Sequence, residues 1–416
     1  MISHQGVMLS SLPQIWPHCT RIRDGRKAFE GLRSLPYNGA EASKMDSRER
    51  TFLALNFEQP DRVPLDLWIS SGLWNKLAQQ RGVSKETFLD AHDVDLRYIA
   101  GPRYVGPPQR SFADGSREDL WGVRRRTVEL HVRDSAGCDA TERYQELSES
   151  PLAAATTVED IDAYDHWPSA DWFDYECVAE QCSAIQTQGR VAVFMGDRLN
   201  RIAQLKPAMY LRGIEHILLD MSLNPDIARA ILRHVREFYL AYAERIYAAA
   251  SGRLDLVLTG DDFGAQNAPL LSPAMWTDYL ATGFSDYVTL AHNYGLRVMH
   301  HTCGSVRPLI PAMMRRGLDV LQSLQPEANG MDPYELKAAF GDQPDARLAF
   351  QGGVSIQRTM PFGSTADVRA AVRRCIDALA PGGGYILGAA HNIQADAPLA
   401  NLDALLAAHR EFGSYR

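Results

Sequence analysis

Residues Val298–Arg307 read V-M-H-H-T-C-G-S-V-R, a short apolar run that leads into two histidines, a cysteine and a glycine. This pattern predicts a β-strand, in which residues two apart share a face. His301 and Cys303 therefore point the same way, and His300 points the opposite way, toward a covering layer of helices. An imidazole beside a thiolate suits zinc. Because H-x-C is a short pattern, a core histidine next to a small buried cysteine explains the same residues.

Seven other segments have the character of strands, and helical segments lie between them. Several are continuous apolar runs, as expected of parallel strands that are buried on both faces. Eight strands that alternate with helices predict an α/β fold, the (β/α)8 TIM barrel. A doubly wound sheet is the alternative, but no G-x-G-x-x-G follows the first strand. The predicted strands are Arg62–Trp68, Leu96–Gly101, Val191–Gly196, Leu256–Gly260, Arg297–Cys303, Val320–Gln325, Leu348–Gly352 and Tyr385–Ala390.

Composition narrows the class of protein. The chain has 416 residues, of which 45% are hydrophobic, enough for one large barrel with insertions. The net charge is −8 and the charges are dispersed, which argues against nucleic acid as a partner. The 6 cysteines include no CxxC pair and indicate a reducing, cytoplasmic compartment. No apolar run approaches the ~18–20 residues of a membrane span.

The barrel is expected to occupy residues 45–416. Asp46 and Glu49 open a helical pattern, whereas residues 1–44 show no sustained periodicity and are taken as an N-terminal extension. The segment 102–147, after the second strand, lacks a helical pattern. Its alternating residues 126–132 predict a β-hairpin inserted into the barrel.

The carboxyl ends of barrel strands meet at one mouth, where chemistry is done, so a third metal ligand should follow another strand. His391 follows the eighth strand and is the preferred candidate. Asp261 and Asp262 follow the fourth strand and Glu327 follows the sixth; these carboxylates are rival ligands. For Asp261 and Asp262, capping of the next turn is an equally good interpretation.

Several motifs together resemble the uroporphyrinogen decarboxylase superfamily. The resemblance covers most of residues 45–416 and implies the same barrel. The segments that carry it are Arg50–Leu55, Pro60–Pro64, the H-x-C-G of His301–Gly304, Gly317–Asp319, Phe350–Gly353 and Gly383–Ile386.

Two branches of this superfamily differ in their site motifs. True decarboxylases bind porphyrinogen carboxylates with an arginine-rich segment after the first strand, where this chain has Leu67–Gly72 and no arginine. The cobamide-linked zinc methyltransferases carry an H-x-C motif and a later cysteine after the last strand. His301 and Cys303 match that motif, and His391 stands in place of the later cysteine. The resemblance is therefore closer to the methyltransferase branch and implies a zinc ion on these three residues.

The implied activity is methyl transfer between a small substrate or thiol and a corrinoid (cobalamin) on a partner protein. Asp261, Asp262 and Glu327 are the expected acid, base or substrate-binding groups. The family further implies a homodimer. Two alternatives stay open: a decarboxylase of the uroporphyrinogen type that acts on another carboxylate substrate, and a non-catalytic barrel that binds a corrinoid protein. The methyl donor and acceptor are not defined by the sequence.

Overall fold

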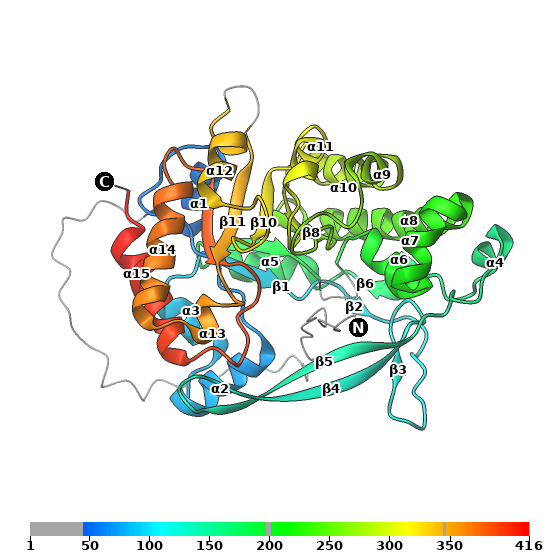
Figure 1. Ribbon diagram of the computed structural model, residues 1–416, viewed down its shortest axis with the longest axis horizontal. Coiled ribbons are helices and arrows are strands. Elements are labelled where there is room, and N and C mark those ends of the chain that lie inside the picture. The colour runs from blue at the N-terminus through cyan, green and yellow to red at the C-terminus, as the bar shows by residue number, and fades with distance from the viewer. Residues whose placement is uncertain (1–44, 197–200, 344–346, 416) are drawn as a thin grey trace.

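A computed structural model describes residues 45–196, 201–343 and 347–415. Its centre is a sheet of seven parallel strands, and each overlaps a strand that the sequence predicts. The strands neighbour one another in chain order, as a barrel requires (Figure 1). They are β1 (Leu96–Ile99), β7 (Val191–Phe194), β8 (Leu256–Gly260), β9 (Arg297–His301), β10 (Val320–Leu324), β11 (Ala349–Val354) and β12 (Tyr385–Ala389).

Residues 63–69 take the eighth place, between β12 and β1. On one side the Asp66 amide donates to the Leu387 carbonyl at 2.9 Å. On the other side the Asp95 amide donates to the Leu65 carbonyl, also at 2.9 Å. The segment of the first predicted strand therefore lies between β12 and β1 and closes the barrel, although it forms isolated bridges rather than a continuous strand.

The inside of the barrel changes from apolar to polar along the strands. Inward-facing residues alternate with outward-facing ones. Trp68 and Tyr98 pack at the edge of the apolar interior, and the inward positions nearest the carboxyl ends are His301, Gln322 and Gln351. The apolar interior itself is formed by Leu96, Val191, Val193, Leu256, Leu258, Met299, Val320, Ala349 and Ile386.

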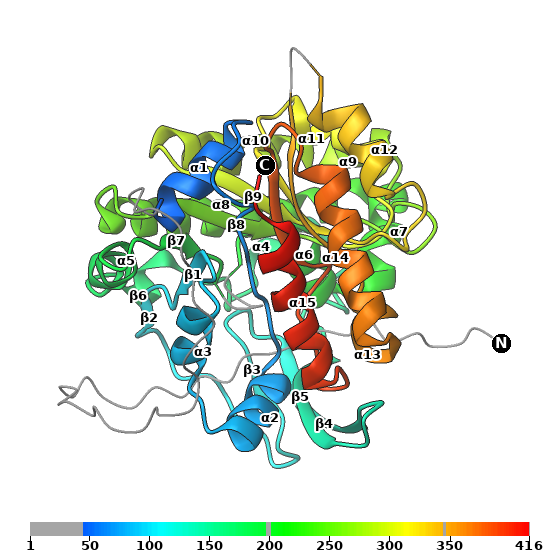
Figure 2. The same cartoon turned by 90° about the vertical axis from the view of Figure 1, so that its left-hand side faces the viewer.

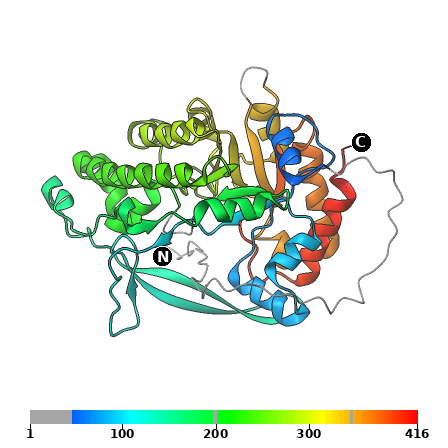
Figure 3. The same cartoon turned by 180° about the vertical axis from the view of Figure 1, so that it is seen from behind.

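Helices cover the outside of the barrel. The helices are α1 (Ser47–Leu55), α2 (Ser71–Arg81), α3 (Lys85–Ala91), α4 (Val158–Asp162), α5 (Val178–Gln186), α6 (Leu205–Arg212), α7 (Ile214–Leu223), α8 (Pro225–Ala250), α9 (Pro273–Tyr279), α10 (Ala281–Asn293), α11 (Ile310–Met314), α12 (Pro333–Leu336), α13 (Thr359–Phe362), α14 (Thr365–Leu379) and α15 (Leu399–Phe412). Helix α14 packs against β11, β12 and α15 (Figure 2). On the opposite side α5 packs against β1, β7 and α8 (Figure 3).

The predicted insertion after the second strand is present. Strands β4 (Arg124–Arg133) and β5 (Asp139–Glu149) form a long antiparallel hairpin along the lower edge of the molecule in Figure 1. Three two-residue strands accompany it, namely β2 (Arg103–Tyr104), β3 (Arg117–Glu118) and β6 (Phe173–Asp174).

Buried polar contacts fasten this hairpin to the mouth of the barrel. Asp134, at its turn, pairs with Lys76 of α2. The Lys76 ammonium also donates to the carbonyl oxygens of Ala395 and Ala397, at 3.0 and 2.9 Å. Glu142 of β5 accepts a hydrogen bond from the Ala395 amide at 2.7 Å. Because α2 follows the first strand and Ala395 follows β12, the hairpin joins the two chain segments that close the barrel.

Helix α1 begins at Ser47, close to the predicted start of the barrel domain at residue 45. Asp46 caps α1 by accepting a hydrogen bond from the Glu49 amide at 2.8 Å. Residues 1–44, expected as an extension, lie outside the described residues. Among the helices of the described ranges, none combines the length and apolar character that spanning a lipid bilayer requires.

Candidate metal centre

Strand β9 delivers the first two candidate ligands. His301 is its last residue and is 1% exposed; Cys303 follows two positions later and is half-buried. Both side chains face the interior of the mouth, with 3.5 Å between His301 Nε2 and Cys303 Sγ. Strand alternation therefore brings together an imidazole and a thiol, as the sequence predicts.

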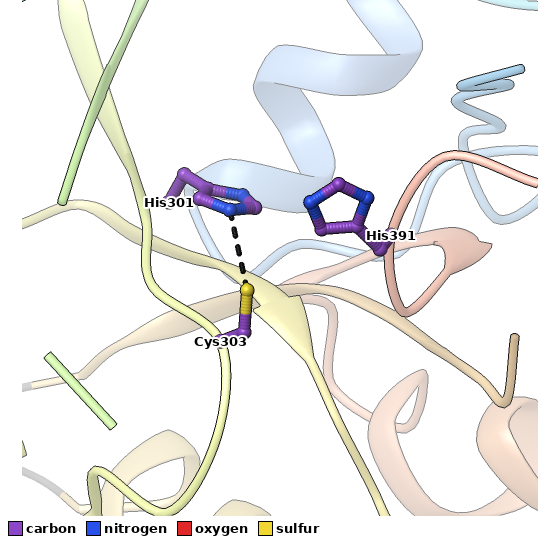
Figure 4. A group of neighbouring side chains, drawn as sticks. All are labelled: His301, Cys303 and His391. Carbon is purple, nitrogen blue, oxygen red and sulfur yellow. Dashed lines mark hydrogen bonds between the residues drawn. The ribbon is translucent and has the colours of Figure 1, made fainter. Parts of the chain in front are cut away.

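His391 joins them from the far side of the mouth. It follows β12, which is separated from β9 by β10 and β11. One ligand atom from each of His301, Cys303 and His391 lies within 4.8 Å of the others (Figure 4). The two imidazole rings stand edge to face, with centroids 5.1 Å apart. These three residues can hold a metal ion.

A glutamine aligns His301. The Nδ1–H group of His301 donates to Oε1 of Gln322, on the neighbouring β10, at 2.5 Å. Gln322 is fully buried. With its proton on Nδ1, the ring directs the lone pair of Nε2 toward Cys303, which is the arrangement seen in metal-ligating histidines. Gln322 lies within the next predicted strand, but the sequence alone does not pair it with His301.

Trp68 and Asn392 align His391. The Trp68 indole stacks on the His391 ring, and Asn392 contacts Nδ1 of His391 through its side-chain oxygen and through its amide. Burial lowers the pKa of His391 to about 3 and also lowers the pKa of His301. Both imidazoles are therefore neutral, the form that binds metals.

The surroundings of Cys303 favour its protonated thiol, so a cation would have to be close by for the thiol to ionise. Burial raises its pKa far above the usual range, and the neighbouring Asp262 carboxylate raises it further. The thiol donates to Asp262 Oδ1 at 3.3 Å. A coordinated metal would replace this proton.

Asp262 follows β8, and its carboxylate lies beside Cys303 and His301. Burial opposes its charge, but the Lys206 ammonium holds the pKa of the Asp262 carboxyl well below its usual range. Lys206 pairs with Oδ2 of this carboxylate. Asp262 Oδ1 lies 3.4 Å from His301 Nε2. A charged carboxylate thus borders the candidate ligands.

The neighbouring Asp261 has a different position. Its two carboxylate oxygens accept hydrogen bonds from the backbone amides of Gln204 and Lys206, each at 2.7 Å, at the start of α6. Burial raises the pKa of Asp261 to about 7. These contacts match the capping interpretation and fix the helix end that carries Lys206.

Glu327 lies beyond the end of β10 and is half-buried. Burial raises the pKa of its carboxyl, and the Arg358 guanidinium opposes this shift. Its charge also acts on Cys375 of α14. Those two groups belong to the β11 and α14 side of the barrel.

His300 faces outward, as predicted. Its Nδ1 lies 2.9 Å from Thr259 Oγ1, and its ring packs against Phe263 and Phe284. Burial lowers the pKa of His300 to about 3. The side chains of His300 and His301 therefore lie on opposite faces of β9.

A second polar group lies deeper in the barrel, and the sequence did not predict a role for it. Asp66 is 1% exposed and accepts hydrogen bonds from the Tyr98 hydroxyl at 2.7 Å and from Gln351 Nε2 at 3.0 Å. A side chain at Gly388 would lie 2.5 Å from that Gln351 nitrogen, so glycine makes room for the contact. Burial raises the pKa of Asp66 to about 6.

A family model described as uroporphyrinogen decarboxylase (URO-D) matches residues 152–412, which include all three candidate ligands. The chain belongs to the uroporphyrinogen decarboxylase family. This match confirms the superfamily resemblance of the sequence motifs. No curated protein matches this chain.

Among solved structures, the URO-D family barrel is similar to a methyltransferase from Methanosarcina mazei. The TM-score is 0.59 at 17% sequence identity, and the alignment covers 89% of this chain and 99% of that chain. At this identity the similarity shows a shared fold.

Proposed function

We propose that this URO-D family protein is a zinc-dependent methyltransferase that moves a methyl group between a small substrate or thiol and a corrinoid carrier. The observation that carries the proposal is the convergence of His301, Cys303 and His391 at the barrel mouth. The shared fold with a methyltransferase from Methanosarcina mazei supports it.

The donor set fits zinc. Two imidazole nitrogens and one thiolate sulfur are ligands that zinc prefers, and three protein ligands leave a position for a substrate. His301 and His391 are neutral, and Cys303 needs a cation to ionise. When bound, zinc supplies a Lewis acid that lowers the pKa of a thiol or polarises the atom that carries the methyl group.

The surrounding residues prepare the centre for this chemistry. Gln322 and Trp68 hold the two imidazoles in fixed planes. Of the three carboxylates proposed to transfer protons or bind substrate, Asp262 is the one in contact with candidate ligands. We assign it the role of accepting the proton of an incoming thiol, and Lys206 keeps it charged until then. Asp261 acts indirectly, by holding α6, and Glu327 remains a candidate for substrate binding.

The proposal extends to partners. A corrinoid is large and planar, and we expect a separate corrinoid protein to present it at the barrel mouth. The small-molecule methyl donor or acceptor would bind beside the metal. We also expect a homodimer in the cytoplasm, as the family resemblance implies.

Decarboxylation is the second candidate, because the family model is described by that activity. The segment after the first strand argues against a porphyrinogen substrate: it presents Trp68 to the mouth, and residues 67–72 include no arginine. A decarboxylase in this barrel would need another carboxylate substrate. It would release carbon dioxide without dependence on Cys303.

Metal analysis and a methyl-transfer assay test the proposal. Purified protein should hold about one zinc per chain, and the assay should demethylate methylcobalamin with a thiol acceptor or methylate cob(I)alamin from a methoxylated donor. His301→Ala and Cys303→Ser should lose metal and activity by more than the about 10–100-fold that outer-shell changes cost. His300→Gln, on the outer face of the same strand, should retain zinc. Zinc-free, active wild-type protein would contradict the proposal, and zinc-loaded protein inactive with every donor and acceptor would point to a binding module.

A further inference from the structure

Strand β10 contains one extra residue near its carboxyl end. Its pairing with β11 is regular from Val320 to Gln322 and resumes with Leu324 opposite Gly352, so Ser323 is passed over in the register. Ser323 has a φ of 75°, and among the non-glycine residues that the structure describes it is the one member of the central sheet with a positive φ. An extra residue in one strand of a pair is a β-bulge.

The bulge turns an additional side chain into the barrel. In a regular strand, Gln322 and Leu324 would share a face. Gln322 faces inward, where it accepts a hydrogen bond from His301, whereas Leu324 packs in the core between the barrel and its helices. The change of face between these two residues leaves Ser323 on the inner side, next to Gln322.

The Ser323 hydroxyl joins two sides of the barrel mouth. It donates a hydrogen bond to the carbonyl oxygen of Ala390, the residue before His391. The Cys303 sulfur lies within hydrogen-bond range of the same hydroxyl. Cys303 follows β9 and His391 follows β12, so a single side chain, 1% exposed, spans the space between the segments that carry two candidate ligands.

Neighbouring residues accommodate the bulge. The Ser323 amide faces the side-chain oxygen of Gln351 at 3.5 Å. A Cβ atom at Gly352 would lie 2.9 Å from the Leu324 nitrogen, so glycine is needed opposite the bulge. The left-handed backbone at position 323 would suit glycine better than serine, and strained residues of this kind gather at functional sites. The hydroxyl, rather than the turn, therefore accounts for the serine.

We propose that Ser323 is a positioning residue of the candidate metal centre, whose hydroxyl sets the spacing between the chain segments that carry Cys303 and His391. The inference rests on the proposed function for its catalytic meaning and on the hydrogen bond to Ala390 for its geometry. Without the hydroxyl, the Ala390 carbonyl loses this partner, and the His391 segment can move away from Cys303.

Two substitutions separate the hydroxyl from the backbone strain. Ser323→Ala removes the hydroxyl and keeps the strain, whereas Ser323→Gly removes both. Both should lower zinc affinity by about 10–100-fold, as outer-shell changes do, measured by competition with a chromophoric chelator. In crystal structures of the metal-free proteins, the distance from Cys303 Sγ to the His391 ring should be wider in both variants than in the wild type. The urea midpoint of Ser323→Gly should nonetheless lie above that of Ser323→Ala.

Ser251 provides a matched control. It follows the carboxyl end of α8 in the left-handed conformation, with a φ of 51°, and its side chain is exposed. Ser251→Gly should likewise be more stable than Ser251→Ala, but neither variant should change zinc affinity. The comparison distinguishes the relief of backbone strain from the loss of the Ser323 hydroxyl.

Two results would overturn the inference. The first is wild-type zinc affinity in both Ser323 variants. The second is a metal-free Ser323→Ala structure in which Cys303 and His391 keep the wild-type separation. A Ser323→Gly protein that is as stable as the wild type and still loses affinity would support it, since the hydroxyl would then act on the centre rather than on the fold. If the wild type binds no zinc, the proposed function fails, and the metal-free structures still decide whether the hydroxyl sets the spacing.

Discussion

Trp68 stacks on His391, with ring centroids 5.0 Å apart and ring planes inclined by 24°. The same indole meets the His301 ring edge-on, at 5.5 Å and 87°. Trp68 comes from the segment 63–69, whereas His301 ends β9 and His391 follows β12. One aromatic side chain thus sets the planes of both imidazoles, and with them the directions of the lone pairs.

Replacing Trp68 by Leu should weaken metal binding through His391. An aromatic pair contributes about 0.5–1.5 kcal/mol beyond its buried area, which corresponds to a loss of about two- to tenfold in zinc affinity. Chelator competition measures this loss. In a His391→Cys background the stacked imidazole is gone and the edge contact with His301 remains, so Trp68→Leu should have a smaller further effect. Equal losses in both backgrounds would show that Trp68 acts on the fold rather than on His391.

Replacing Gln322 by Leu should leave the Nδ1–H group of His301 buried without an acceptor. An unsatisfied buried donor costs about 1–3 kcal/mol, and outer-shell changes of this kind lower metal affinity about 10–100-fold. Gln322→Glu keeps an acceptor and makes the imidazole a stronger ligand, so it should retain or raise zinc affinity. If both variants bound zinc as the wild type does, Gln322 would have no part in aligning His301.

Asp66 should make stability depend on pH. Burial raises its pKa from 3.8 to about 6 in the folded protein, although hydrogen bonds from Tyr98 and Gln351 oppose the shift. Between these values the folded protein holds a proton that the unfolded chain releases, so stability falls as pH rises through this window. At about 1.4 kcal/mol per pKa unit, the loss by pH 7 is roughly 3 kcal/mol.

Asp66→Asn removes this titration and tests the assignment. The variant should be more stable than the wild type by roughly 2–3 kcal/mol at pH 7, and the difference should shrink toward pH 4. Urea unfolding of the metal-free proteins over this pH range gives both curves. A difference that does not change with pH would mean that Asp66 does not titrate in this range.

The ion pair between Lys76 and Asp134 should be essential for stability as a unit. Their side chains are 2% and 1% exposed. Lys76→Met leaves a buried carboxylate without its partner, which costs about 3–5 kcal/mol. Adding Asp134→Asn removes that charge and keeps an acceptor for the Ala136 and Cys138 amides, which now donate to Asp134 at 2.9 Å. Urea unfolding should therefore show that the double variant regains much of the stability that Lys76→Met loses. No regain would mean that the two residues are not coupled.

The strands and the candidate ligands could be predicted because both depend on local order in the chain. Continuous apolar runs marked the parallel strands, and alternation placed His301 and Cys303 together. The same alternation, carried past Gly260, distinguishes the two aspartates: Asp262 continues the inward face of Leu258 and Gly260, and Asp261 continues the outward face. Alternation is a property of strands, and both aspartates lie beyond the end of the strand, where it is not assumed to hold.

The partners of the ligands could not be predicted in this way. Trp68 meets His391 because the first and eighth strands adjoin only when the barrel closes. The contact between Gln322 and His301 depends on the register of β9 against β10, in which these residues pair directly. Register is a property of the assembled sheet, and no single segment contains it.

The closure of the barrel has a thermodynamic consequence. The first strand joins β12 and the loop after it through four backbone hydrogen bonds, donated by the amides of Asp66, Ser70, Leu387 and Ile393, and this seam closes the barrel. Trp68 lies on one side of the seam and His391 on the other. Whatever immobilises His391 must therefore also hold the seam shut, and ligation would act as a latch whose effect appears as slower deuterium uptake at the Ile393 amide.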